Sequence, residues 1–127
     1  MKSKHKFRAW DETQKYMAYQ GSPDLETIQS FMYHFGDKEL MQFTGLYDKN
    51  GKEIYEGDLF KGLTESIKCY EVFWDNGMFK MRYLQSNGEY WTWGNIDKCI
   101  SILEEYNQLE VIGNIFENPE LINQPIH

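Results

Sequence analysis

Glycine turns divide this chain into short segments, and their spacing limits the possible folds more than any other sequence feature. Residues 41–58 (MQFTGLYDKNGKEIYEGD) show the pattern best, because two short apolar and aromatic runs flank a DKNG tetrapeptide. Asn50 and Gly51 tolerate the positive φ angles that tight hairpin turns need, so a β-hairpin is predicted there. Gly57 and Asp58 predict a second sharp turn directly after it. Short strands separated by glycine corners are typical of small, strongly bent sheets and barrels.

A second hairpin is predicted further along the chain. Asn76 and Gly77 lie between two runs of β-forming residues, 70–74 and 78–84. A third run, 89–93, follows another Asn-Gly pair. Consecutive strands joined by tight turns pair with their neighbours, so these three runs predict an antiparallel meander.

The flanking segments add a hairpin, two helices and a last strand. Residues 6–10 and 15–19 alternate well enough to predict a first hairpin, whose basic start is expected to be solvated. Apolar residues at helical spacing favour a helix over a strand at 24–35, and predict another at 97–106. Residues 109–116 return to a strand pattern, in which Gly113 indicates a bulge or a close approach.

The composition supports a β-rich domain. Aromatic residues make up 17% of the 127 residues, and broad rings pack well on a pleated surface. We therefore predict a mainly β fold with a minor α+β component: a small, strongly bent antiparallel sheet or an SH3-like barrel, with one or two short helices. The chain is expected to be one domain, residues 1–127. Its parts are an N-terminal hairpin with a helical insertion (1–39), a β core (40–118) and a frayed tail (119–127).

The charge and the reactive residues exclude several classes of protein. The net charge is −7, and because an acidic body repels phosphates, general nucleic-acid binding is disfavoured. Neither a transmembrane helix nor a signal peptide is expected. Cys69 and Cys99 are predicted to be reduced, core-facing thiols. His5, His34 and His127 are too scattered to predict a metal site.

Three segments in order resemble the YopX family of phage and prophage proteins: 6–11 (KFRAWD), 41–58, and 110–121 (EVIGNIFENPEL). The resemblance implies a phage or prophage origin, and therefore the cytoplasm of a bacterial host. It also implies a β-rich fold and self-association, and it brings no established activity or catalytic residues. The stretches 21–39 and 61–68 match no motif of the family, and 61–68 is polar enough to predict a mobile loop.

One group of carboxylates could support chemistry. Glu53, Glu56 and Asp58 are the densest acids in the central stretch, and a metal-dependent nuclease needs two or three acids around a cation. Turn formation explains Gly57 and Asp58 equally well, and the further acids and lysine of such sites are missing. The sequence therefore predicts a protein that is not an enzyme and that uses no metal or cofactor.

A second hypothesis concerns the meander. Its aromatic residues could stack on single-stranded nucleic acid beside basic side chains, or they could simply form the core. Core packing is favoured because the surrounding charge is negative. The possible binding face consists of Trp74, Lys80, Arg82, Trp91 and Trp93.

Taken together, these patterns predict an accessory or regulatory phage protein that acts by binding. A core this small leaves aromatic surface exposed, so a homo-oligomer or another protein partner is expected. The alternatives are a weak single-strand nucleic-acid binder that uses strands 70–93, and an acidic DNA mimic that inhibits a host enzyme.

Overall fold

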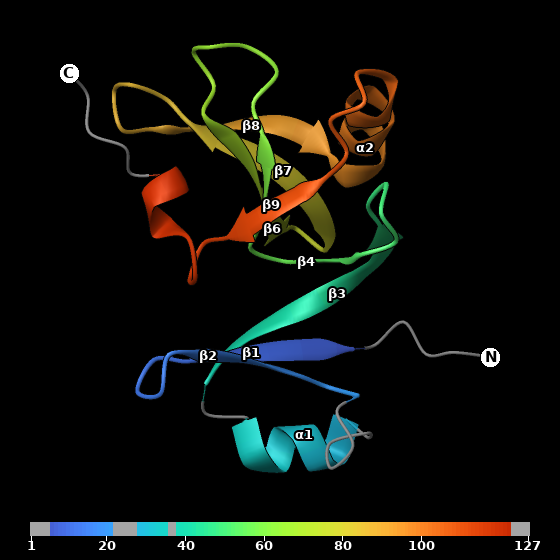
Figure 1. Cartoon of the computed structure of the whole chain (residues 1–127), viewed down its shortest axis with the longest axis vertical. Coiled ribbons are helices and arrows are strands. Elements are labelled where there is room, and N and C mark those ends of the chain that lie inside the picture. Colours follow the sequence, from blue (N-terminus) through green and yellow to red (C-terminus); the bar gives the residue numbers. More distant parts are fainter. Residues whose placement is uncertain (1–5, 22–27, 36–37, 123–127) are drawn as a thin grey trace.

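The computed structural model describes residues 6–21, 28–35 and 38–122, and within them the protein is mostly β (Figure 1). Two antiparallel sheets lie one above the other in that view, each accompanied by one helix. The elements in chain order are β1 (Phe7–Asp11), β2 (Tyr16–Tyr19), α1 (Ile28–Phe35), β3 (Glu39–Tyr47), β4 (Glu53–Tyr55), β5 (Asp58–Lys61), β6 (Cys69–Asp75), β7 (Met78–Leu84), β8 (Tyr90–Asn95), α2 (Ile96–Glu105), β9 (Val111–Asn114) and the 3-10 turn η1 (Pro119–Leu121).

The first sheet has the strand order β2-β1-β3-β4. Strand β3 is long enough to serve two neighbours: its first half pairs with β1 from Glu39 to Gln42, and its second half pairs with β4 from Phe43 to Tyr47. Helix α1 covers one face of this sheet, where Phe31 is fully buried against Ala9. The small side chains of Ala9 on β1 and Ala18 on β2 leave room for the broad Phe31 ring of the helix, which explains the close packing.

The second sheet has the order β8-β7-β6-β5-β9 and curls strongly into a half-barrel. Its concave face holds the main hydrophobic core, to which Phe60, Tyr70 and Met81 contribute from three different strands. Helix α2 lies against this core through Ile96, Cys99 and Leu103, which share one helical face. The pattern at 97–106 therefore predicted the helix and its buried side. Of the two predicted architectures, the strongly bent open sheet is the one observed.

The predicted hairpins are confirmed, with one correction to turn chemistry. Asn76 and Gly77 have φ angles of 51° and 80°, as the favoured two-residue hairpin turn requires. At the earlier turn only Gly51 has a positive φ, whereas Asn50 does not. The Gly51 N–H instead donates to the Asp48 carbonyl at 3.0 Å, so a type I turn precedes the glycine and Asn50 needs no left-handed conformation.

Asp48 connects that turn to the half-barrel. Its carboxylate is buried and accepts the N–H groups of Asn50 (2.9 Å), Lys52 (2.9 Å) and, across the molecule, Val111 (3.0 Å). Burial alone would raise the pKa of Asp48, but the three N–H donors outweigh it and lower the pKa. The acid of the DKNG turn therefore also fixes the start of β9.

The C-terminal part differs from the predicted strand and tail. Strand β9 ends at Asn114 rather than at 116, because the Asn114 side chain accepts the N–H groups of the next residues and turns the chain. Gly113 lies beside a register shift, and a Cβ there would meet the Asn118 Oδ1 at 2.5 Å, so the predicted close approach is confirmed. Where a fraying tail was predicted from residue 119, Pro119–Leu121 forms η1, and 123–127 lie outside the described residues.

Other predictions have mixed outcomes. Cys69 and Cys99 are both free and buried, as predicted. Helix α1 is described only from Ile28, so the first residues of the predicted 24–35 helix lie outside the described part of the chain. Residues 62–68 form a loop that the Gly62 N–H closes onto the Lys68 carbonyl at 3.2 Å. Within the described ranges, neither helix is long and apolar enough to cross a membrane.

Candidate functional site

The corner between β4 and β5 brings the two sheets together. Gly57 has a φ of 90°, and its N–H donates to the Val72 carbonyl of β6 at 2.8 Å. The Gly57 carbonyl in turn accepts the N–H of Ile115 at 3.0 Å. A Cβ at this position would lie 3.2 Å from the Met41 sulfur of β3, so both the backbone angle and the space favour glycine. The predicted turn at Gly57 is thus the point at which β3, β6 and the segment after β9 meet.

A buried ion pair lies directly behind this corner. The Arg8 guanidinium is 2.8 Å from the Asp58 carboxylate, and their side chains are 2% and 1% exposed. Asp58 also accepts the Tyr55 N–H at 2.7 Å, while Arg8 donates to the Glu56 carbonyl at 3.1 Å and lies over the Tyr55 ring. Burial raises the pKa of Asp58, against the opposing effect of Arg8. Each buried charge is neutralised by the other, so the ion pair stabilises the contact between β1 and β5.

This arrangement corrects the expectation of a solvated basic N-terminal strand. Arg8 alternates with apolar neighbours as expected, but its side chain faces the half-barrel rather than solvent. Lys6, on the same strand edge, pairs with Glu53 at 2.5 Å. The sequence contained no signal for the long-range partner, because Arg8 and Asp58 are 50 positions apart.

The acids proposed for metal chemistry do not converge. Glu53 pairs with Lys6, Asp58 pairs with Arg8, and Glu56 accepts the N–H of Gln42 at 3.2 Å. Within residues 6–21, 28–35 and 38–122, no group of three or more acidic, histidine or cysteine side chains is placed to hold a metal ion. Each of the three carboxylates has a separate structural partner.

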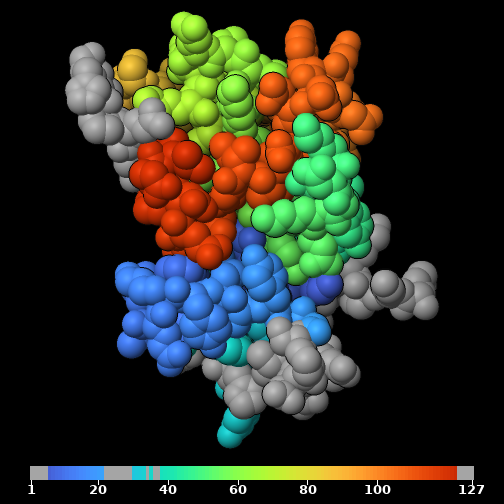
Figure 2. Space-filling view, in the orientation of Figure 1, coloured from blue at the N-terminus to red at the C-terminus, as the bar shows by residue number. Residues whose placement is uncertain are grey.

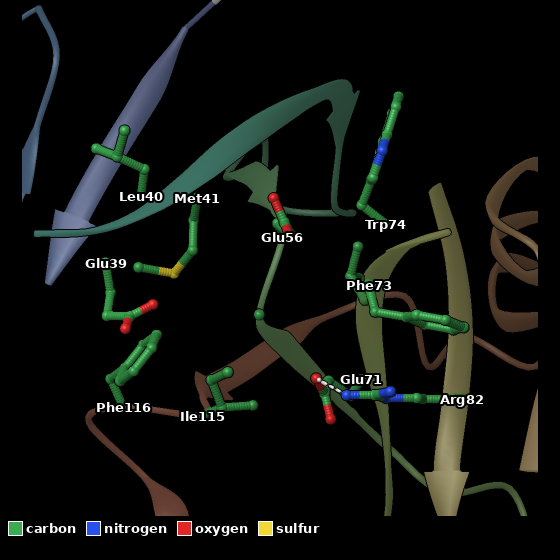
Figure 3. Close-up of a pocket in the computed structure, with 12 residues that line it drawn as sticks. Glu39, Leu40, Met41, Glu56, Glu71, Phe73, Trp74, Arg82, Ile115 and Phe116 are labelled. Atoms are coloured by element: carbon green, nitrogen blue, oxygen red, sulfur yellow. Dashed lines mark hydrogen bonds and ion pairs between the residues drawn. The ribbon is translucent and has the colours of Figure 1, made fainter. Parts of the chain in front are cut away.

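An open cleft of about 270 Å³ lies between the two sheets beside the Gly57 corner (Figure 3). Strand β3 supplies Glu39 and Met41, the corner supplies Glu56, and β6 and β7 supply Phe73 and the facing Glu71–Arg82 pair. Phe116, after β9, forms part of the opposite wall. The cleft therefore has apolar walls and several carboxylates at its edge and floor.

Arg82 is held in place on the β6–β7 side of the cleft. Its guanidinium is 3.1 Å from the buried Glu71 carboxylate and lies over the rings of Phe73 (4.6 Å) and Tyr90 (4.1 Å). Rings on both sides of a guanidinium stabilise it through cation–π attraction. The side chain is 31% exposed, and its buried Nε–H has no hydrogen-bond partner among the described residues.

Glu56 is a half-buried carboxylate of the cleft that no ion pair among the described residues neutralises. Burial raises its pKa, the nearby negative charge of Glu71 raises it further, and the Gln42 N–H and Arg8 only partly oppose this. No cation of the described chain lies within ion-pair distance of Glu56. A half-buried acid is thus kept at the cleft without a partner of opposite charge.

A second groove of about 350 Å³, with a mixed polar and apolar lining, opens on the far side of Trp74. Trp74 and Met78 are 48% and 44% exposed, and both border the groove. Leu46 of β3, Phe79 of β7 and Ile96 of α2 provide further apolar lining. We call these five residues the Trp74 groove.

The residues of the predicted aromatic and basic face lie on opposite sides of the half-barrel sheet. Trp74 and Trp91 pair across strands with Phe79 and Tyr83 on the core side, and Trp93 stacks on Tyr70 at 4.1 Å. Lys80 and Arg82 lie on the convex side, where they pair with Asp75 (3.0 Å) and Glu71.

Sequence reasoning missed Glu71, Phe73 and Phe116. Glu71 lies within a continuous run of β-forming residues, and an acid on a strand predicts a solvent-facing position, not a buried one. Phe116 lies beyond the last strand, where its ring stacks on Trp10 at 5.9 Å. In Figure 2 the C-terminal segment accordingly lies directly on the N-terminal hairpin.

Comparisons with known proteins agree with this architecture. The sequence model of a family described as "YopX protein" matches residues 6–123. The crystal structure of protein EF1440 from Enterococcus faecalis is similar, with a TM-score of 0.55 and 26% sequence identity over 94% of this chain and 98% of that chain. No curated protein matches the sequence.

Proposed function

The chain belongs to the YopX family, and from that premise we propose that it is a phage or prophage accessory or regulatory protein that acts by binding other protein chains, including copies of itself. It works without catalysis, in the cytoplasm of a bacterial host. The cleft and the groove are both open to solvent, whereas the acids considered for metal chemistry are engaged in separate structural contacts. Open surfaces that can accept a partner, together with acids already held in structural contacts, support binding over catalysis.

The observation that supports the proposal best is the Trp74 groove. Two large apolar side chains stand at its border, each nearly half exposed, and further apolar side chains line it. Exposed aromatic and methionine side chains around a hollow are typical of protein–protein interfaces, where tryptophan often contributes most of the binding energy. Filling the groove with a side chain of another protomer would remove this surface from water.

Sedimentation velocity at micromolar concentration tests the proposal. We expect the protein to sediment as a homo-oligomer, and Trp74→Ser to shift it towards the monomer. Trp91→Ser is the matched control, because Trp91 is 57% exposed and does not line the groove. A wild-type protein that remains monomeric at the highest accessible concentration would contradict self-association. Equal effects of both substitutions would show that the interface does not lie at the groove.

Single-stranded nucleic-acid binding remains the second candidate. In its favour, Lys80 and Arg82 share the convex face with the rings of Phe73 and Tyr90. Against it, both basic groups are already paired with carboxylates, and the chain is acidic overall. A fluorescent oligonucleotide at low salt distinguishes the two, since binding that is lost in Lys80→Glu would favour nucleic acid.

A further inference from the structure

The cleft of Figure 3 has an unbalanced charge. Glu39, Glu56 and Glu71 contribute three carboxylates, and Arg82 is the cleft's cation. The Arg82 guanidinium already forms an ion pair with the Glu71 carboxylate at 3.1 Å. Glu39 and Glu56 have no ion-pair partner among the described residues, so the cleft is complementary to added positive charge.

The walls of the cleft suit a flat cation with an apolar stem. Phe116 and Met41 lie on the side opposite Arg82, and Phe73 shows that a ring of this cleft accepts a guanidinium at 4.6 Å. Guanidinium groups stack on aromatic rings and are less strongly hydrated than ammonium groups, so they enter half-buried sites more readily. The existing Glu71–Arg82 pair is thus an internal example of the recognition chemistry available here.

The size of the cleft limits the occupant. At about 270 Å³ it lies just below the range of pockets that enclose drug-sized ligands or cofactors. A single long side chain from another polypeptide fits such a volume better than a whole small molecule. The acids belong to different elements and do not form a group that could hold a metal ion within the described ranges.

We propose that this cleft binds one arginine side chain of a partner polypeptide, with Glu56 and Glu39 as the counter-ions and the Phe116 ring as an apolar wall. This site goes beyond the proposed self-association, because among the described residues it has only Trp74 in common with the Trp74 groove, and it does not require an oligomer. The raised pKa of Glu56 agrees with such a role, since a bound cation stabilises the charged carboxylate that burial disfavours.

The test is an NMR titration of the ¹⁵N-labelled protein with N-acetyl-arginine methylamide, a probe small enough to enter the cleft. We expect saturable shifts at the backbone amides of Gln42, Glu56 and Gly57, and weaker binding when the pH is lowered through the pKa of Glu56. The citrulline analogue, which has the same shape without the charge, is expected to cause none of these shifts. Equal shifts with citrulline would overturn the proposal.

Matched variants separate the site from general attraction to an acidic protein. Glu56→Gln should weaken arginine binding about fivefold, as expected for loss of a partly solvated ion pair. Glu110→Gln removes the same charge from an exposed acid outside the cleft and should leave the affinity unchanged. Equal losses in both variants would indicate non-specific attraction and reject the site.

Two further outcomes are decisive. The Gln42 N–H can donate to an amide oxygen as well as to a carboxylate, so Glu56→Gln is expected to keep the native spectrum; Glu39→Gln provides a second variant if it does not. Identical shifts with Mg²⁺ would show that the cleft attracts any cation and would reject arginine recognition. Failure of this titration leaves the sedimentation result untouched, because Glu39 and Glu56 do not line the Trp74 groove.

Discussion

Arg8 and Arg82 contact the same kinds of groups and differ in how far solvent reaches them. Each guanidinium lies within about 3 Å of a carboxylate and over two aromatic rings. Arg8 is enclosed on every side, with 2% of its side chain exposed, whereas Arg82 is 31% exposed beside the cleft. The two sites therefore differ in access to water and not in residue type. The enclosed Arg8 connects the two sheets, whereas the accessible Arg82 lines the cleft.

Removing the enclosed arginine should give the largest effect. Arg8→Met leaves Asp58 buried without a counter-ion, which typically costs about 3–5 kcal/mol of the free energy of unfolding. Urea denaturation measures the loss. The double variant Arg8→Met/Asp58→Asn should recover part of it, because the uncompensated charge is then absent. A loss below about 1 kcal/mol would mean that Arg8 is no more important than an exposed arginine.

Asp48 extends the comparison, because it is a buried acid that accepts backbone N–H groups instead of pairing with an arginine. Asp48→Ala removes three hydrogen bonds to backbone N–H groups and should cost about 2 kcal/mol. Because the pKa of Asp48 is lowered in the folded state, its contribution is present above the ordinary aspartate pKa of about 4 and is lost as the pH falls through the folded pKa. Thermal melts should therefore show the two proteins converging in acid. A constant difference across that range would contradict ionised Asp48 as the stabilising form.

The accessible arginine should matter less. Arg82→Met leaves Glu71 unpaired, but the site borders an open cleft and water can partly replace the guanidinium, so a loss of about 1–2 kcal/mol is expected. The same urea titration measures it. A loss as large as that of Arg8→Met would remove the distinction between the two arginines.

The smallest effect should have the opposite sign. The folded-state pKa of Glu56 is raised, so its contribution to stability is full below the unfolded glutamate pKa and is lost as the pH rises through the folded pKa. Glu56→Gln should therefore gain about 0.5 kcal/mol at neutral pH, a small amount because the group is only half-buried. Melting temperatures of the two proteins at neutral and acidic pH check this. A variant less stable than the wild type at neutral pH would show that the carboxylate is structurally required.

The local parts of this fold could be predicted from the sequence. Asn76-Gly77 indicated its hairpin, Gly57 its corner, and the spacing of Ile96, Cys99 and Leu103 the buried side of α2. These signals depend on neighbours within a few positions, where backbone sterics and side-chain periodicity act. Together with the family resemblance, they were enough for a mainly β, strongly bent sheet.

The cleft could not be predicted in the same way. Glu39 comes from β3, Glu71 from β6 and Glu56 from the turn between β4 and β5, and their proximity depends on how the two sheets meet. The aromatic and basic residues of the meander illustrate the same limit: strand alternation places Lys80 and Trp74 on opposite faces, but the sequence does not say which face is covered. Contacts between distant segments are set by packing, for which single-sequence periodicity gives no signal.

The position of β5 has a consequence for how the chain is synthesised. This strand lies between β6 and β9, and β9 comes last among the strands. While the ribosome is still adding residues before Val111, one side of β5 exposes unpaired backbone groups, which β9 later covers. Completion of the half-barrel therefore waits for the synthesis of β9, and a nascent chain halted before that point presents a ready template for unwanted strand pairing.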